Sequence, residues 1–126
     1  MTKKSILLIE DNADDETLTL RAFRKCGIAC QITVARDGAE ALEFLSENGG
    51  GQADLVLLDL KLPKMNGIQV LERLRSDERT RELPVVVVST SNYERDISAC
   101  LALGVRGFLQ KPVDCHELAK IIGDSY

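Results

Sequence analysis

Five polar residues of the kinds that can do chemistry follow short apolar runs of the sequence. In chain order they are Glu10, Asp11, Asp59, Ser89 and Lys111. Three carboxylates can hold a hard divalent cation, while a hydroxyl and an ammonium can hold the oxygens of a phosphoryl group. If the fold brings these residues together, the set suits phosphoryl transfer.

The acidic residues are candidate ligands of Mg²⁺ or Mn²⁺. Mg²⁺ prefers about six oxygen ligands in octahedral geometry, some of them water. Asp11 and Asp59 can supply carboxylate oxygens, and Glu10 can bind directly or through a water. The backbone carbonyl of Lys61, two residues after Asp59, can reach the same ion.

Asp59 is the candidate nucleophile, because aspartate carboxylates form aspartyl-phosphates. The ammonium of Lys111 can then neutralise the charge of the phosphoryl oxygens, and the hydroxyl of Ser89 can donate a hydrogen bond to one of them. Taken singly, each residue also has a structural interpretation. Asp11 and Asn12 could form a turn or cap a helix, Ser89 could begin a turn, and Lys111 could be a solvated strand end. The combination at separate strand ends favours the chemical interpretation.

The elements that must position these residues alternate along the chain. Apolar β-rich runs predict strands at Ser5–Ile9, Gln31–Ala35, Leu55–Leu58, Val85–Val88 and Gly107–Leu109. Helical periodicity predicts a helix capped by Asp14 or Asp15, then Gly38–Glu47, Gly67–Arg75, Tyr93–Leu103 capped by Asn92, and a last helix that Asp114 caps and that continues through Ile122. Continuous apolar strands indicate a doubly wound α/β fold whose five-stranded parallel sheet is covered on both faces. The carboxyl ends of its strands form the reactive edge.

Length and composition limit the alternatives. The chain of 126 residues fits one domain, residues 1–126, and its net charge of −4 with 4% aromatic residues disfavours nucleic acid and anionic membranes as partners. We see no signal peptide and no apolar run long enough to span a membrane, so we expect a cytoplasmic protein.

The four cysteines, Cys26, Cys30, Cys100 and Cys115, match no zinc-binding spacing. We expect them to be reduced thiols. Cys115 and His116 could form a nucleophile–base or metal-binding pair, but neighbouring residues of a helix point in different directions, which favours a structural interpretation.

Four segments carry a resemblance to a known family. They are Ile9–Asn12, Val56–Gly67, Val87–Ser89 and Gln110–Pro112. With these segments the chain resembles the CheY-like receiver domain of two-component response regulators over nearly its whole length. The resemblance implies a flavodoxin-like (βα)₅ fold with strand order 2-1-3-4-5.

The resemblance also assigns roles to residues. Asp59 is implied as the phosphoacceptor, Glu10 and Asp11 as the metal-binding pair, and Ser89 and Lys111 as the switch hydroxyl and lysine. Three further features that it implies are a switch aromatic at Phe108, a cis peptide bond before Pro112, and two positions that tune the lifetime of the phosphate, Lys61 and Ser91.

The implied protein is a phosphoacceptor switch and not a conventional enzyme. A sensor histidine kinase donates the phosphoryl group. Phosphorylation then alters the surface of the protein so that it binds a partner, or the protein passes the phosphate on. The stretch from Asp11 through Lys25 and the glycine-bearing loop before Asp54 resemble the stand-alone regulators paired with phytochrome-like histidine kinases. We expect this protein to be a monomer or a phosphorylation-dependent homodimer.

Two other functions are weighed against this one. Haloacid-dehalogenase-like phosphatases carry a second Asp two residues after the nucleophile, where this chain has Lys61. A pseudo-receiver or flavin-binding module would keep the fold without phosphorylation. The complete set of acids with Ser89 and Lys111 argues against a pseudo-receiver, and the few aromatic residues argue against flavin.

Overall fold

The computed structural model describes residues 4–46, 49–90 and 94–125. The five strands are β1 (Lys4–Ile9), β2 (Cys30–Ala35), β3 (Leu55–Asp59), β4 (Val85–Ser89) and β5 (Gly107–Gln110). They form one parallel sheet in the order β2-β1-β3-β4-β5. The predicted doubly wound fold and its strand order are confirmed.

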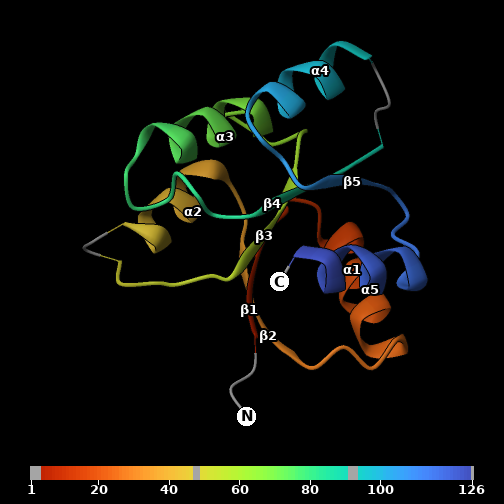
Figure 1. Ribbon diagram of the computed structural model, residues 1–126. Coiled ribbons are helices and arrows are strands. Elements are labelled where there is room, and N and C mark those ends of the chain that lie inside the picture. Colours follow the sequence, from red (N-terminus) through yellow and green to blue (C-terminus); the bar gives the residue numbers. More distant parts are fainter. Residues whose placement is uncertain (1–3, 47–48, 91–93, 126) are drawn as a thin grey trace.

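Five helices connect and cover the strands. They are α1 (Ala13–Lys25), α2 (Gly38–Leu45), α3 (Gly67–Ser76), α4 (Glu94–Ala102) and α5 (Cys115–Ser125). Helices α1 and α5 lie on one face of the sheet, and α2, α3 and α4 lie on the other (Figure 1). Because helices cover both faces of the sheet, the ends of its strands are the parts that can form a site.

Two buried apolar layers hold the sheet between its helices. Leu55 and Leu57 of β3 belong to the layer that also contains Phe23 of α1 and Leu118 of α5. Their neighbours on the strand point the other way, and Val56 belongs with the side chains of α2 and α3. Every residue of β3 and β4 is buried, because helices cover both faces of the sheet. Burial on both faces explains why the sequence runs of these strands are continuously apolar.

Helix caps differ in part from the prediction. Asn12, rather than Asp14 or Asp15, caps α1 by accepting a hydrogen bond from the Asp15 N–H at 3.0 Å. Asp114 caps α5 as expected, since its Oδ1 accepts from the His116 and Glu117 N–H groups. The predicted cap at Asn92 lies outside the described residues.

Candidate functional site

The register of the parallel sheet brings the polar strand ends to one edge. Ile9, the last residue of β1, is paired with Leu58 of β3, and Asp59 is paired with Val88 of β4. Ser89 is paired with Gln110 of β5, and its backbone carbonyl accepts a hydrogen bond from the Lys111 N–H at 3.0 Å. The residues that follow these positions are therefore neighbours, although they are far apart in sequence.

Lys111 joins the acidic residues at this edge. Its Nζ lies 2.7 Å from Glu10 Oε1, 2.9 Å from Asp15 Oδ2 and 3.2 Å from Asp59 Oδ2. An ammonium has three hydrogen atoms to donate, so these three carboxylates satisfy it. Burial alone would lower the pKa of Lys111, but the hydrogen bonds to Glu10 and Asp15 and the charge of Asp59 outweigh burial and raise it above its usual range. Lys111 is therefore a permanent cation in the site.

The carboxylate of Asp59 is held at both oxygens. Oδ1 accepts a hydrogen bond from the Lys61 N–H at 3.1 Å, and Oδ2 faces Lys111. Asp59 itself is only 4% exposed, at the end of a strand with no other polar residue. The backbone N–H of Lys61 thus fixes one oxygen of Asp59, and the second oxygen faces the ammonium of Lys111.

Glu10 is buried beside Asp59. Burial, together with the neighbouring Asp59 carboxylate, raises the pKa of Glu10 to about 7, while the ammonium of Lys111 acts in the opposite direction. Its Oε2 also accepts a hydrogen bond from the Asn12 N–H at 3.3 Å. A second positive charge at this point would favour the ionised form of Glu10.

The carboxylates of Glu10, Asp11 and Asp59 fit a divalent cation. One oxygen from each lies within 4.8 Å of the others, with Glu10 and Asp59 buried and Asp11 exposed to solvent. An all-oxygen set with one side open to water is the environment that Mg²⁺ takes in proteins. We call Glu10, Asp11, Asp59 and Lys111 the acidic site from here on.

The loop after Asp59 packs closely against the strand that it leaves. The Gly67 N–H donates to the Leu60 carbonyl at 2.9 Å, and a Cβ atom on Gly67 would lie 2.6 Å from the carbonyl oxygen of Asp59. Asn66 and Gln69 then form a reciprocal capping box that starts α3. The glycine is needed because the backbone beside the candidate nucleophile leaves no room for a side chain.

The remaining predicted residues lie around this edge. Ser89 is buried at the end of β4, and Lys61 is exposed. Phe108 on β5 packs partly against the core and lines a surface groove of about 320 Å³ with Leu109 and Ile121. The Lys111–Pro112 bond is cis, as the resemblance implied. Ser91 lies outside the described residues.

Asp15, which contacts the acidic site through Lys111, is a residue that sequence reasoning missed. We expected it to be a possible helix cap, but its side chain instead binds Lys111 from the first turn of α1. A signal for it was present. An acid in the first turn of a helix that directly follows an acidic strand end points toward the same edge of the sheet.

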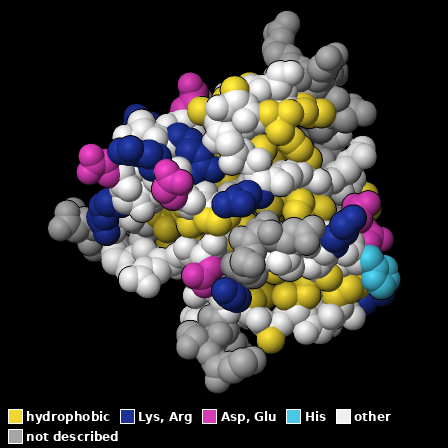
Figure 2. Space-filling view, in the orientation of Figure 1, with side chains coloured by type: hydrophobic (Ala, Val, Ile, Leu, Met, Phe, Trp, Pro, Cys, Tyr) yellow, Lys and Arg dark blue, Asp and Glu magenta, His cyan; other side chains and the backbone are white. Residues whose placement is uncertain are grey.

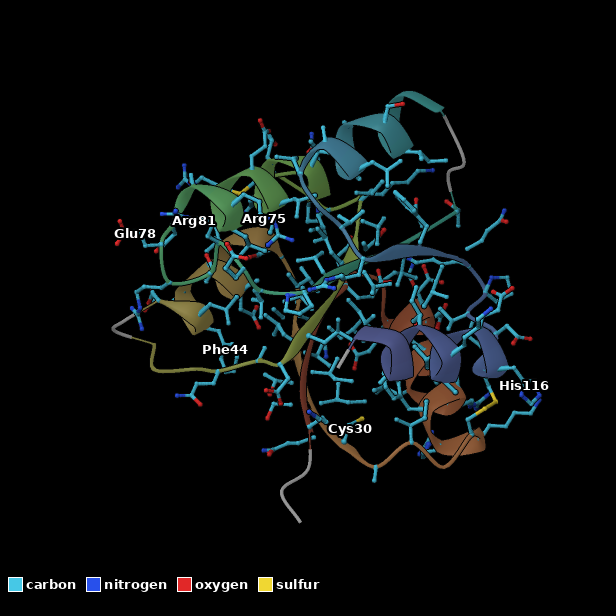
Figure 3. The ribbon with its side chains drawn as sticks, in the orientation of Figure 1. Cys30, Phe44, Arg75, Glu78, Arg81 and His116 are labelled. Atoms are coloured by element: carbon cyan, nitrogen blue, oxygen red, sulfur yellow. A yellow bond between two sulfur atoms is a disulfide. The ribbon has the colours of Figure 1, made fainter. Side chains whose placement is uncertain are left out.

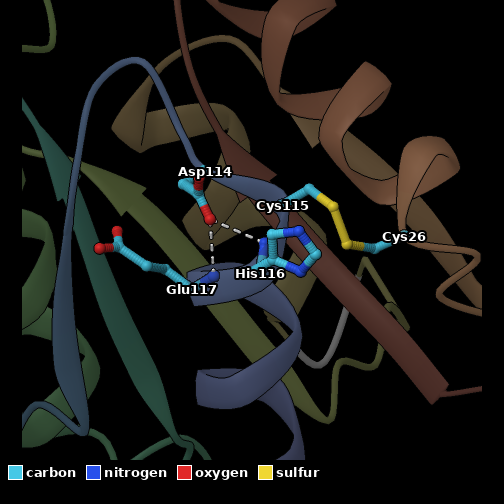
Figure 4. The surroundings of a disulfide bond; sticks show 5 residues. All are labelled: Cys26, Asp114, Cys115, His116 and Glu117. Atoms are coloured by element: carbon cyan, nitrogen blue, oxygen red, sulfur yellow. Dashed lines mark hydrogen bonds between the residues drawn. A yellow bond between two sulfur atoms is a disulfide. The ribbon is translucent and has the colours of Figure 1, made fainter.

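The expectation of four reduced cysteines was wrong. Cys26 and Cys115 form a disulfide, while Cys30 and Cys100 are not disulfide-bonded. The bond arises because α1 and α5 pack side by side, which brings the end of one helix to the start of the other (Figure 4). His116 lies beside the sulfurs, but a sulfur in a disulfide is no thiolate, so Cys115 is neither a free nucleophile nor a metal ligand here.

Comparison with known proteins identifies the class. The model of the response regulator receiver domain matches residues 6–123, and the chain belongs to this family. The chain is similar to the bacteriophytochrome response regulator AtBRR, with 42% identity and a TM-score of 0.85 over 98% of this chain and 93% of that one. It is also similar to the phosphorylated cyanobacterial phytochrome response regulator RcpA, with 35% identity and a TM-score of 0.81 over 98% and 91%.

A more distant relative bears on the metal. The receiver domain of the sensor histidine kinase PA1611 from Pseudomonas aeruginosa PAO1 is 27% identical, with a TM-score of 0.83 over 98% of this chain and 97% of that one. Its structure holds a magnesium ion coordinated in the active site cleft.

Proposed function

We propose that this chain is a response regulator receiver that accepts a phosphoryl group on Asp59 from a histidine kinase, in a reaction that requires Mg²⁺. The observation that carries the proposal is the environment of Asp59. One oxygen is fixed by the Lys61 N–H at 3.1 Å, and the other faces the buried ammonium of Lys111 at 3.2 Å, which also contacts Glu10. A carboxylate held in this way is oriented for attack on a phosphorus atom.

Glu10, Asp11 and Asp59 would hold the cation, together with the backbone carbonyl of Lys61 and water. Bound there, Mg²⁺ or Mn²⁺ supplies positive charge to the phosphoryl oxygens. The carboxylates of this chain would set its position, and the closeness of their oxygens, within 4.8 Å of one another, supports the assignment.

Lys111 and Ser89 are proposed to hold the phosphoryl group on Asp59. Lys111 already contacts the Asp59 oxygen that would carry it, at 3.2 Å, so its ammonium can shift from a carboxylate to a phosphoryl oxygen. Ser89, at the end of the neighbouring strand, has a hydroxyl that can donate to another oxygen. In the transfer, the nitrogen–phosphorus bond of the donor phosphohistidine breaks, its electron pair stays on the imidazole, and the Asp59 oxygen–phosphorus bond forms.

The response is proposed to pass from this edge to the surface around β5. Movement of Ser89 toward the phosphoryl group would let Phe108 repack, because both lie on neighbouring strands. Phe108 lines the groove that it shares with α5, where hydrophobic side chains gather on the face shown in Figure 2. A downstream protein or a second copy of the chain would read the change there.

The partner upstream is proposed to be a sensor histidine kinase, and the similarity to bacteriophytochrome regulators favours a phytochrome-like one. Within the described ranges, no helix is long and apolar enough to cross a membrane. We place the protein in the cytoplasm, where such kinases present their phosphohistidine. Lys61 and Ser91 are the proposed positions that tune how long the phosphate lasts.

The test is phosphorylation by acetyl phosphate, read by intact mass. With Mg²⁺ the protein should gain one phosphate, and Asp59→Asn, which keeps the shape of the side chain, should gain none. Adding a chelator should stop the reaction in the wild type. Equal labelling of Asp59→Asn, or labelling without metal, would contradict the proposal. If neither phosphate nor beryllofluoride binds, the chain is a pseudo-receiver that acts as a fixed binding module.

A further inference from the structure

The disulfide lies where two helices meet on one face of the sheet. Cys26 is the residue directly after α1 and Cys115 is the first residue of α5, with a sequence separation of 89 and their Cα atoms 5.7 Å apart. Both faces of the sheet are already covered by buried apolar layers. A domain of this size folds on such a core without a covalent staple, so the bond is available for another role.

The same short segment is tied to both ends of α1. Near the start of the helix, Asp15 binds the Lys111 ammonium at 2.9 Å. At its end, Cys26 is bonded to Cys115, four residues after Lys111 in the sequence. Helix α1 has 13 residues and is therefore about 20 Å long. The disulfide thus limits the freedom of the segment 111–115, which carries the cation of the acidic site.

The two cysteines of the disulfide differ in their exposure to solvent. Cys26 is partly exposed, whereas Cys115 is only 8% exposed. Figure 3 shows the disulfide beside His116 at the outer surface of the molecule, well separated from Cys30. Cys26 is therefore the more accessible residue for attack by a thiol in solution, with the sulfur of Cys115 as the leaving group.

We propose that Cys26 and Cys115 form a reversible redox site, and that its disulfide form slows the phosphorylation of Asp59. The second half of this proposal rests on the proposed function. The site reacts with two classes of compound. A dithiol reductant opens the bond and becomes a disulfide itself, and a disulfide oxidant closes the bond again.

The exchange balances without any other reactant. A reductant thiolate attacks the Cys26 sulfur, the bond between the two protein sulfurs breaks, and its electron pair goes to the Cys115 sulfur, which takes up a proton. The second thiol of the reductant then attacks the mixed disulfide and releases Cys26 as a thiol. Two electrons and two protons pass from the dithiol to the protein.

The effect on the acidic site follows from the contacts of Lys111. All three of its hydrogen atoms are used by Glu10, Asp15 and Asp59, so it must leave at least one of them to meet a phosphoryl oxygen. In this proposal the shift includes the backbone of the segment 111–115. With Cys115 bonded to Cys26, the far end of the segment is fixed, and the adjustment is opposed.

The first measurement is a thiol count. Protein exposed to a disulfide oxidant and then alkylated under denaturing conditions should take up two alkyl groups, at Cys30 and Cys100, and four after a dithiol reductant. Cys26→Ser should take up three in either condition. Four groups on the oxidised wild type would overturn the redox site.

The second measurement is the rate of phosphorylation by acetyl phosphate with Mg²⁺ in the two forms. We expect the reduced form to react at least about fivefold faster, the lower end of the coupling found between linked sites. Cys26→Ser should react at the fast rate in both conditions. Cys30→Ser, a matched loss of one thiol outside the disulfide, should keep the difference.

The outcomes separate the two proposals. Equal rates for the oxidised and reduced wild type, with phosphate on both, would overturn the redox control and leave the proposed function intact. Loss of the difference in Cys30→Ser would overturn the assignment to Cys26 and Cys115. Absence of phosphate from both forms would overturn the proposed function and the regulatory role together, while the thiol count would still decide whether the redox site exists.

Discussion

Removing the charge of Glu10 should stabilise the metal-free protein at alkaline pH. Glu10 is 1% exposed and lies beside Asp59, and these two features raise its pKa to about 7 in spite of Lys111 at 2.7 Å. The unfolded chain has neither feature. Glu10→Gln keeps the size of the side chain and one acceptor oxygen but removes the charge that the fold disfavours.

The magnitude follows from the difference between the two states. The pKa is 4.5 for the unperturbed group and about 7 in the folded protein. Between these values the folded state holds a proton that the unfolded state has released, so the stability of the wild type falls as the pH rises through this window. At about 1.4 kcal/mol for each pH unit, the free energy of unfolding loses up to about 3 kcal/mol by pH 8. Gln does not titrate and avoids this loss.

The assay is urea unfolding of both proteins in a chelating buffer. Near pH 4.5 we expect little difference, and above pH 7 we expect Glu10→Gln to be more stable by about 2–3 kcal/mol. Glu72→Gln is the matched control, because Glu72 is an exposed glutamate of α3, and it should give no such pH-dependent gain. A gain of the same size near pH 4.5 and near pH 8, or a loss near pH 8, would refute the reasoning.

Added Mg²⁺ should reduce the stability advantage of Glu10→Gln over the wild type. A cation that binds only the folded state raises stability according to its concentration and affinity. The wild type keeps three carboxylates in the site and should gain more from Mg²⁺ than Glu10→Gln. An equal gain for both proteins would mean that Glu10 does not contribute to the cation site.

The remaining predictions concern stability and are checked by urea unfolding. Lys111→Met, in a chelating buffer near pH 8, should lower the free energy of unfolding by about 3 kcal/mol, because buried carboxylates lose their counter-ion. Mg²⁺ should restore most of this loss, and failure to restore it would contradict the cause. Arg75→Met should cost about 2–4 kcal/mol, because its guanidinium donates to four backbone carbonyls. The exposed Arg73→Met should cost little, and equal losses would refute that role. Gly67→Ala should cost about 1–3 kcal/mol, because its Cβ would meet the backbone beside Asp59. The control Gly123→Ala, where the Cβ meets nothing within 4 Å, should not destabilise, and a similar loss at both positions would exclude the steric cause.

The sequence was sufficient for the sheet and for most of the acidic site. Continuous apolar runs predict strands covered on both faces, and the carboxyl ends of parallel strands must meet at one edge. Glu10, Asp59 and Lys111 each lie at or directly beside such an end, so their meeting follows from the strand pattern alone. The left-to-right order of the strands came from the family resemblance, and the structure has that order.

The tertiary structure decided the contacts between helices that are remote in sequence. Whether Asp15 caps its own helix or binds Lys111 depends on how α1 is rotated against the sheet, and Asn12 takes the cap. The pairing of Cys26 with Cys115 depends on the relative shift of α1 and α5, which the packing of their buried side chains sets. Local patterns specify what each segment becomes, because strand and helix signals act over a few residues. They do not specify the rotation and shift between two packed helices, since these depend on the shapes of side chains brought together only by folding.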